Sequence, residues 1–152
     1  MRAFGPSFFF FVHSTMKMSL QYINTNLRKD ISGMDVERLS NIISITLEEL
    51  CISNCRGYEF LHDVLLKLIT REYRTLYEAY GSISVKNHIS KSTVESTVRR
   101  AIRKGIDKSA SESKVKIFGY DVTSINRCRN YYQANEFTYY LMNYILNQYN
   151  NK

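Results

Sequence analysis

The stretch that decides the fold is Ser92 to Ile106, STVESTVRRAIRKGI. At 100° per residue, one side of an α-helix here collects apolar and small residues, namely Val94, Val98, Ala101, Ile102 and Gly105. The other side collects Ser96, Arg99, Arg100 and Arg103. Ser92 and Glu95 have the spacing of a capping box, in which each side chain accepts a backbone N–H of the first turn. The stretch therefore predicts an amphipathic helix with one face in a core and a basic outer face.

Two interpretations of the basic face are open on this stretch alone. The face lies in a groove of nucleic acid, or it is a solvated surface. The distribution of charge along the chain bears on the choice. Between Lys86 and Lys116 there are nine basic and three acidic residues, which accounts for +6 of the chain's net charge of +7. A localised positive charge favours a polyanionic partner, because each phosphate contact releases a condensed counterion. A membrane-surface helix would also need a hydrophobic wedge, which is missing here.

The length and the N-terminal composition predict one domain, residues 34–152, after a tail and linker at residues 1–33. The chain has 152 residues, enough for one domain with a proper core. The apolar run Phe8 to Val12 is too short for a signal peptide or a membrane span. We interpret the first fifteen or so residues as an over-extended start, with Met16 and Met18 as later starts, or as a disordered tail. Residues 19–33 are interpreted as a polar linker.

The cysteines and histidines indicate no metal, cofactor or catalytic site. Three cysteines, Cys51, Cys55 and Cys128, leave no closed set of disulfides, which predicts free thiols and a cytoplasmic location. Cys51 and Cys55 lack the usual zinc spacing and a second pair of ligands. His62 with Asp63, and His88, are the only candidate bases, and no nucleophile elbow or phosphate loop accompanies them. We expect a protein that is not an enzyme and has no small-molecule substrate.

The periodicity predicts helices before the basic stretch. A helix from Asp35, capped by Asp35 or Ser32, has an apolar stripe of Val36, Leu39, Ile43, Leu47 and Leu50. After a break at 51–56, a second helix opens at Gly57 with the stripe Tyr58, Leu61, Val64, Leu65 and Leu68. Residues 70–80 continue it or restart as a helix, with Tyr73, Leu76, Tyr77 and Tyr80 apolar. Gly81 is expected to end that helix. A short helix with Ile83, Val85 and Ile89 then leads into a turn at Ser90 to Ser92, which completes a helix-turn-helix.

The C-terminal third is expected to hold a loop and one more helix. The composition of Asp107 to Lys114, DKSASESK, predicts a mobile polar loop, and Lys116 to Tyr120 a short extended piece. Asn135 is expected to cap a last helix with the aromatic stripe Phe137, Tyr140, Leu141, Tyr144, Ile145 and Tyr149. The stripe is wider than a core needs, so a homodimer contact on paired DNA sites is expected there. The fold class predicted is all-α, with about six helices.

Several segments resemble the C-terminal DNA-binding effector domain of the master sporulation response regulator of endospore-forming Firmicutes. Gly57-Tyr-Glu-Phe-Leu61 resembles that family's Gly-Tyr-x-Tyr-Leu, and Leu47-Glu-Glu-Leu50 resembles the segment before it. Thr97-Val-Arg-Arg-Ala-Ile-Arg103 resembles the recognition-helix signature Arg-Val-Glu-Arg-Ala-Ile-Arg. Phe118-Gly119 and Asn135-Glu-Phe137 resemble motifs near the family's C-terminus. The order agrees across about residues 34 to 148.

The resemblance implies a six-helix domain that binds a short DNA box, often as tandem or paired copies. Arg100 and Arg103 match the two arginines of the signature, which implies contacts in the major groove. Arg99 stands where the family has glutamate, and arginine prefers guanine or phosphate to cytosine. We therefore do not expect the family's usual DNA sequence. The first 33 residues are too short for the family's receiver domain, so we expect control by expression level, by a partner or by occupancy.

The main hypothesis is a sequence-specific transcriptional regulator that binds double-stranded DNA. Its expected DNA-binding residues are Lys86, Lys91, Ser92, Thr93, Ser96, Thr97, Arg99, Arg100, Arg103, Lys104 and Lys114. Among them, the residues at the turn would anchor phosphates, and Ser96 with the three arginines would face base edges. The alternative is a non-catalytic interaction module, which heterodimerises with a full-length regulator through the C-terminal helix.

Overall fold

The computed structural model of the protein describes residues 33–119 and 134–151. These residues contain six α-helices and no strand, so the predicted all-α class is confirmed. The helices are α2 (Val36–Glu49), α3 (Arg56–Ile69), α4 (Leu76–Asn87), α5 (Lys91–Lys108), α6 (Ser111–Phe118) and α8 (Ala134–Asn150). All of them belong to one compact unit, Met34–Lys152. The predictions for the tail, the linker to residue 32, Tyr120 and Cys128 fall outside the described residues.

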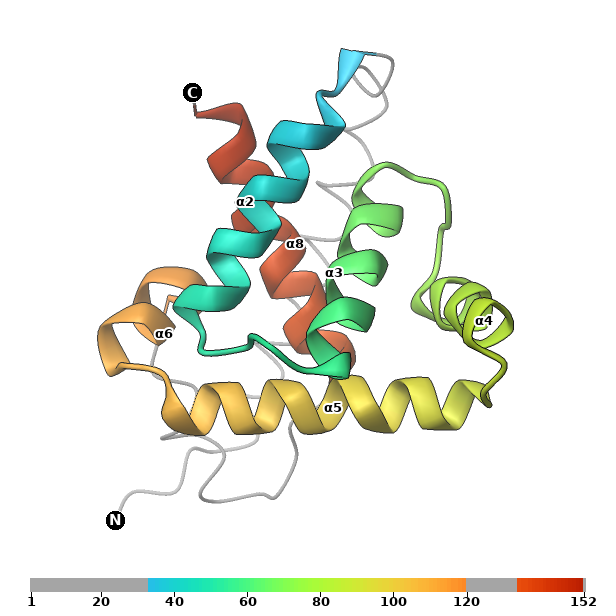
Figure 1. The fold of residues 1–152 in the computed structure, drawn as a ribbon. Coiled ribbons are helices and arrows are strands. Elements are labelled where there is room, and N and C mark those ends of the chain that lie inside the picture. The colour runs from blue at the N-terminus through green and yellow to red at the C-terminus, as the bar shows by residue number, and fades with distance from the viewer. Residues whose placement is uncertain (1–32, 120–133, 152) are drawn as a thin grey trace, which may run out of the picture. The chain divides into compact units, whose positions relative to one another are not determined.

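Helix α5 is the longest element described and the one on which the others are arranged. Figure 1 shows it lying across the lower ends of α3 and α8, with α4 at its start and α6 after its end. α3, α4 and α8 all pack against it, and α2 packs on α3 and α8. The core consists of fully buried aliphatic side chains from these helices, among them Leu39, Ile43, Leu65, Val94, Val98, Ile102, Leu141 and Ile145. None of the described helices is long and apolar enough to cross a membrane.

The start of α2 is joined to the end of α8. The Asp35 side chain caps α2 by accepting the Arg38 backbone N–H at 3.1 Å, which is one of the two caps expected. The Asp35 N–H donates to the Tyr149 hydroxyl at 2.8 Å. The Arg38 guanidinium donates to the Tyr149 carbonyl at 2.9 Å and lies 4.8 Å from the centre of its ring. This tyrosine of the aromatic stripe is therefore used inside the protein.

Two glycines let α5 approach the backbone of its neighbours. A Cβ on Gly57, in the first turn of α3, would lie 2.8 Å from the Thr97 carbonyl oxygen and against the Ala101 methyl. A Cβ on Gly105 would lie 2.7 Å from the Leu50 carbonyl oxygen and against the side chain of Ile52. Real Cβ atoms do not come this close, because such contacts overlap van der Waals radii. α5 therefore lies in close contact with α3 at Gly57, and with the α2–α3 loop at Gly105.

The helix boundaries around Gly81 differ from the expectation. Gly81 does not end a helix: α4 runs through it from Leu76 to Asn87. A capping box formed by Thr75 and Glu78 begins the helix, and burial of Leu76, Ala79, Tyr80 and Ile83 holds it. These contributions outweigh the cost of about 1 kcal/mol for a glycine in a helix interior. Tyr77 and Val85, expected on apolar stripes, are instead 71% and 77% exposed.

The loop and extended piece predicted after α5 are also wrong, as is the Asn135 cap. α5 continues to Lys108, and Ser111–Phe118 forms α6, with Gly119 as its left-handed C-cap at φ 80°. The polar composition did not predict this helix, because its stability depends on a few residues that are buried in the core. These are Lys114, Ile117 and Phe118. The Phe118 ring meets Phe137 of α8 edge-on, with ring centres 5.1 Å apart. Asn135 lies inside α8.

Candidate nucleic-acid interface

Helices α4 and α5 are joined by three residues, His88 to Ser90. His88 is in the left-handed conformation at φ 54°, and its N–H and that of Ile89 bond to the carbonyls of Val85 and Ser84. The turn leaves Ser90 extended as the N-cap of α5, where its hydroxyl accepts the Thr93 N–H at 3.1 Å. The capping box predicted at Ser92 is therefore wrong, and the cap lies two residues earlier. Ser92 lies inside the first turn because the left-handed His88 turns the chain sooner than expected.

The division of α5 into two faces is confirmed. Its buried residues are Val94, Val98, Ala101, Ile102, Gly105 and Ile106. Opposite to them, six exposed residues form what we call the α5 outer face, namely Ser92, Ser96, Arg99, Arg100, Arg103 and Lys104; Thr93 and Asp107 are also exposed on this side. α5 has six basic residues and two acidic ones, Glu95 and Asp107. Its first turn contains no acidic residue. The face is thus positively charged over three turns of helix.

The hydroxyl groups of this helix are bonded within its own first turns. The Ser90 hydroxyl lies 2.9 Å from that of Ser92 and 2.8 Å from that of Thr93. Ser96 and Thr97 each donate to the Thr93 carbonyl, at 3.1 Å and 2.7 Å. A hydroxyl that donates to its own helix keeps its lone pairs as acceptors. Thr97 is half-buried on the side that faces Gly57, so it lies at the edge of the outer face.

The three arginines are in two different states. Arg99 Nη2 lies 2.6 Å from Glu95 Oε1, an ion pair one helical turn long. Arg100 and Arg103 are exposed, as is Lys104. Within residues 33–119 and 134–151, none of these three makes an ion pair, a hydrogen bond or a ring contact. Within the described part of the chain, their charges are therefore not neutralised by a neighbouring acid.

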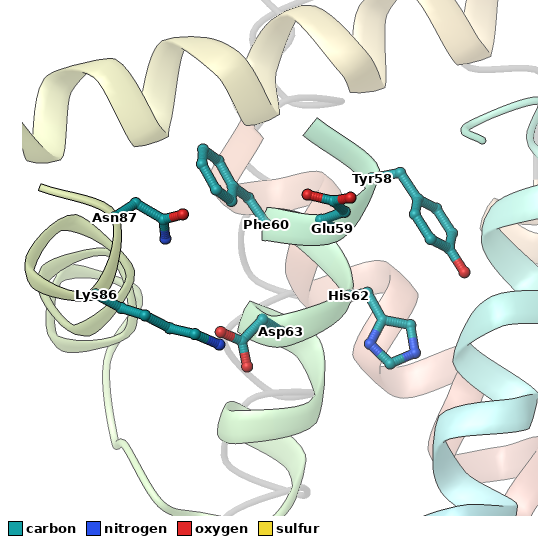
Figure 2. Close-up of a pocket in the computed structure, with 7 residues that line it drawn as sticks. All are labelled: Tyr58, Glu59, Phe60, His62, Asp63, Lys86 and Asn87. Carbon is teal, nitrogen blue, oxygen red and sulfur yellow. The ribbon is translucent and has the colours of Figure 1, made fainter. Parts of the chain in front are cut away.

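Three lysines among the expected DNA-binding residues, Lys86, Lys91 and Lys114, have different surroundings. Lys91 Nζ is 3.6 Å from the centre of the Tyr77 ring, and its side chain crosses Gly81. Lys86 lines a hollow of about 490 Å³ together with Tyr58, Glu59, Phe60, His62, Asp63 and Asn87. Figure 2 shows its ammonium pointing from α4 toward Asp63 of α3. Lys114 of α6 is only 6% exposed, and its role in DNA binding stays a prediction.

Two contacts at this site were missed by the sequence reasoning. Glu95 was assigned to a capping box, although its spacing of four residues from Arg99 also fits a helical ion pair. Tyr77 is predicted to belong to an apolar stripe, whereas its ring lies under Lys91. The spacing signal for the first was present in the sequence. The second depends on the angle between α4 and α5, which no local pattern encodes.

The described residues show no group of three or more metal-binding side chains. Cys51 and Cys55 are free and exposed. His62 Nε2 lies 3.2 Å from the Ser40 hydroxyl, which ties α3 to α2. Comparisons of the chain with protein-family models, curated proteins and solved structures find no match. The resemblance to the sporulation effector domain stays a prediction.

Tyr80 of α4 carries a buried hydroxyl behind the Glu95–Arg99 pair. The side chain is 5% exposed, and its hydroxyl has no hydrogen-bond partner within the described parts of the chain. Burial, with a smaller contribution from the Glu95 charge, raises the pKa of Tyr80 to about 12. The hydroxyl is thus neutral at physiological pH and costs stability, because it gave up its bonds to water.

Replacing Tyr80 with phenylalanine is expected to raise the free energy of unfolding by about 1 kcal/mol, since it removes an unpaired buried hydroxyl. The wild-type protein should also lose stability between pH 10 and 12. Over that range the unfolded chain releases the phenolic proton while the folded chain retains it. Urea unfolding of both proteins at pH 7 and pH 11 measures both effects. A Y80F variant less stable at pH 7, or a gap that narrows at pH 11, would contradict this environment for Tyr80.

Proposed function

We propose that the protein binds double-stranded DNA with sequence specificity, as a transcriptional regulator, with α5 in the major groove. The observation that carries the proposal is the α5 outer face. It presents three guanidinium groups within two turns, and two of them, Arg100 and Arg103, are exposed and make no ion pair within the described residues. Solvated helix faces of this kind usually carry acids between the bases. Here only Glu95 and Asp107 do so.

The dimensions of α5 fit this role. Its 18 residues give a length of about 27 Å at a rise of 1.5 Å per residue. The major groove of B-DNA is about 12 Å wide and admits one α-helix. Ser96, Arg99, Arg100 and Arg103 are spaced i, i+3, i+4 and i+7. Long recognition helices that lie in the groove along their length use this spacing to reach successive base pairs. The buried side of α5 is fixed by α3 and α8, so the face is held rigidly.

The side chains have separate roles in this proposal. Arg100 and Arg103 donate to the O6 and N7 acceptors of guanine or to phosphate, and Ser96 accepts or donates at a base edge. Lys104 binds phosphate. Ser92 and Thr93 lie at the helix N-terminus, where the positive end of the helix dipole also favours phosphate. Lys91 is a weaker candidate than expected, because it lies over Tyr77.

The alternative function, an interaction module that pairs through α8, finds less support. Its basis was an aromatic surplus on α8. Tyr149 is bonded to α2, and Tyr140 meets the Phe118 ring of α6 with centres 6.2 Å apart. Part of the surplus is thus used inside the protein. We still propose a homodimer on paired DNA sites. Its contact would use the aromatic residues of α8 other than Tyr140 and Tyr149. Because Arg99 stands where the resembling family has glutamate, we do not propose that the protein binds the target sequence of the sporulation regulators.

Binding-site selection from random duplex DNA at two salt concentrations tests the proposed function. We expect an enriched motif and a binding constant that falls steeply with salt. Four phosphate or base contacts from Arg99, Arg100, Arg103 and Lys104 would give a slope of about −3 to −4 in log K against log salt. Salt-sensitive binding without an enriched motif would reduce the function to nonspecific charge attraction. An absence of binding would favour the interaction module.

A further inference from the structure

The Glu95–Arg99 pair distinguishes one arginine of the α5 outer face from the others. Glu95 lies four residues before Arg99, the order in which an acid and a base on a helix attract most favourably. The bond joins Nη2 and Oε1 at 2.6 Å, and the two side chains are 48% and 41% exposed, Arg99 and Glu95 respectively. The ion pair therefore favours one orientation of the Arg99 side chain in the free protein. Arg100 and Arg103 have no such partner within the described residues.

The pair leaves the guanidinium able to bind a base. A guanidinium has five N–H donors in a plane, and Glu95 takes one of them. Four donors remain, so a bidentate contact with guanine N7 and O6 does not require the bond to Glu95 to break. Fixing the side chain beforehand also lowers the entropy that Arg99 loses on binding. The Glu95 carboxylate also weakens DNA binding, because it repels the phosphates. This repulsion is the same for every DNA sequence.

Resting on the proposed function, we propose that Glu95 is a positioning residue, which holds Arg99 to read a guanine base and so determines part of the DNA specificity. Glu95 thus increases the protein's preference for one DNA sequence over others, and it lowers the affinity for all DNA sequences. Arg100 and Arg103, which have no such ion pair in the described residues, adapt to bases or phosphates. The resembling family's signature has glutamate at the position of Arg99. The proposed guanine contact is therefore argued from this chain's own residues and not from the resemblance.

The test compares E95Q with D107N in the full-length chain. Asp107 is the second acid of α5 and is also exposed, and no ion pair joins it to an arginine in the described residues. Both substitutions remove one negative charge from the same helix. The base that Arg99 contacts is first identified as the position at which R99A loses its preference. Affinities are then measured by fluorescence anisotropy for the selected duplex, for duplexes with each other base pair at that position, and for a scrambled duplex.

We expect E95Q to lower the preference for guanine at the Arg99 position by about 2- to 5-fold, the range of an exposed ion pair. It should also bind the scrambled duplex more tightly than the wild type. D107N should tighten binding to all duplexes equally and keep the preference. In the R99A background, E95Q should leave base preference unchanged. An E95Q variant that binds all duplexes equally more tightly overturns the role of Glu95 and leaves the proposed function intact. The absence of any preferred sequence for the wild type overturns both.

Discussion

The R100A/R103A double variant is expected to lose at least about 2 kcal/mol of binding free energy, a factor of about 30 in affinity for the selected duplex. Each arginine contributes about 1–3 kcal/mol if it makes a bidentate base contact. The variant should remain folded, because both side chains are exposed and alanine is the best helix former. Fluorescence anisotropy at two salt concentrations measures the loss, and circular dichroism measures the fold.

A matched control removes two positive charges elsewhere. K67Q/K116Q has the same net charge as R100A/R103A. Lys67 pairs with Glu72 near the end of α3, and Lys116 of α6 pairs with Glu49 of α2. Glutamine can keep a hydrogen bond to each carboxylate. This control should bind the selected duplex within a few-fold of the wild type, and its salt dependence should be unchanged. Equal losses in the two double variants would show that net charge alone drives binding.

The G105A variant is expected to lose about 1–2 kcal/mol of unfolding free energy. Alanine favours a helix interior over glycine by about 0.5–1 kcal/mol. At this position, however, the new Cβ meets the Leu50 carbonyl and the buried Ile52 side chain. Neither neighbour yields easily, because one is backbone and the other is in the core, and overpacking of a core costs about 1–3 kcal/mol. Urea unfolding measures the change.

G81A is the matched control for G105A, since it makes the same change inside another helix. Its Cβ would meet only the Lys91 side chain, 2.8 Å from Cε, and that chain can move. Its stability should equal that of the wild type or exceed it by up to about 1 kcal/mol. If G105A were as stable as G81A, α5 would not lie against the α2–α3 loop as described.

The parts of the fold that the sequence predicted are those with a strong local pattern. The stripes of α2 and α3, and the two faces of α5, follow from helical spacing of apolar residues. Such stripes identify both the helix and its buried side. The Asp35 cap was found for the same reason, because a capping side chain acts on its own first turn.

The errors arose where distant contacts override local composition. DKSASESK is polar, yet Lys114 and the Phe118–Phe137 contact make a helix of this region. Gly81 is unfavourable in a helix, but packing on the core and a capping box carry α4 through it. The packing contacts are not visible within a window of a few residues, whereas the Thr75–Glu78 capping box is a local signal that the prediction did not use. In the candidate site, the basic residues of the α5 outer face were found by spacing, while the surroundings of Lys86, Lys91 and Lys114 depend on how neighbouring helices pack.

The most direct test of DNA binding by the α5 outer face is an NMR titration of the full-length chain with the selected duplex. Changes in backbone amide shifts show which residues the DNA contacts. We predict that the largest changes fall between Ser90 and Lys104, with smaller ones in the core helices behind them. Largest changes on α8 or α2, with those of α5 no greater than the average, would contradict the placement of DNA on α5.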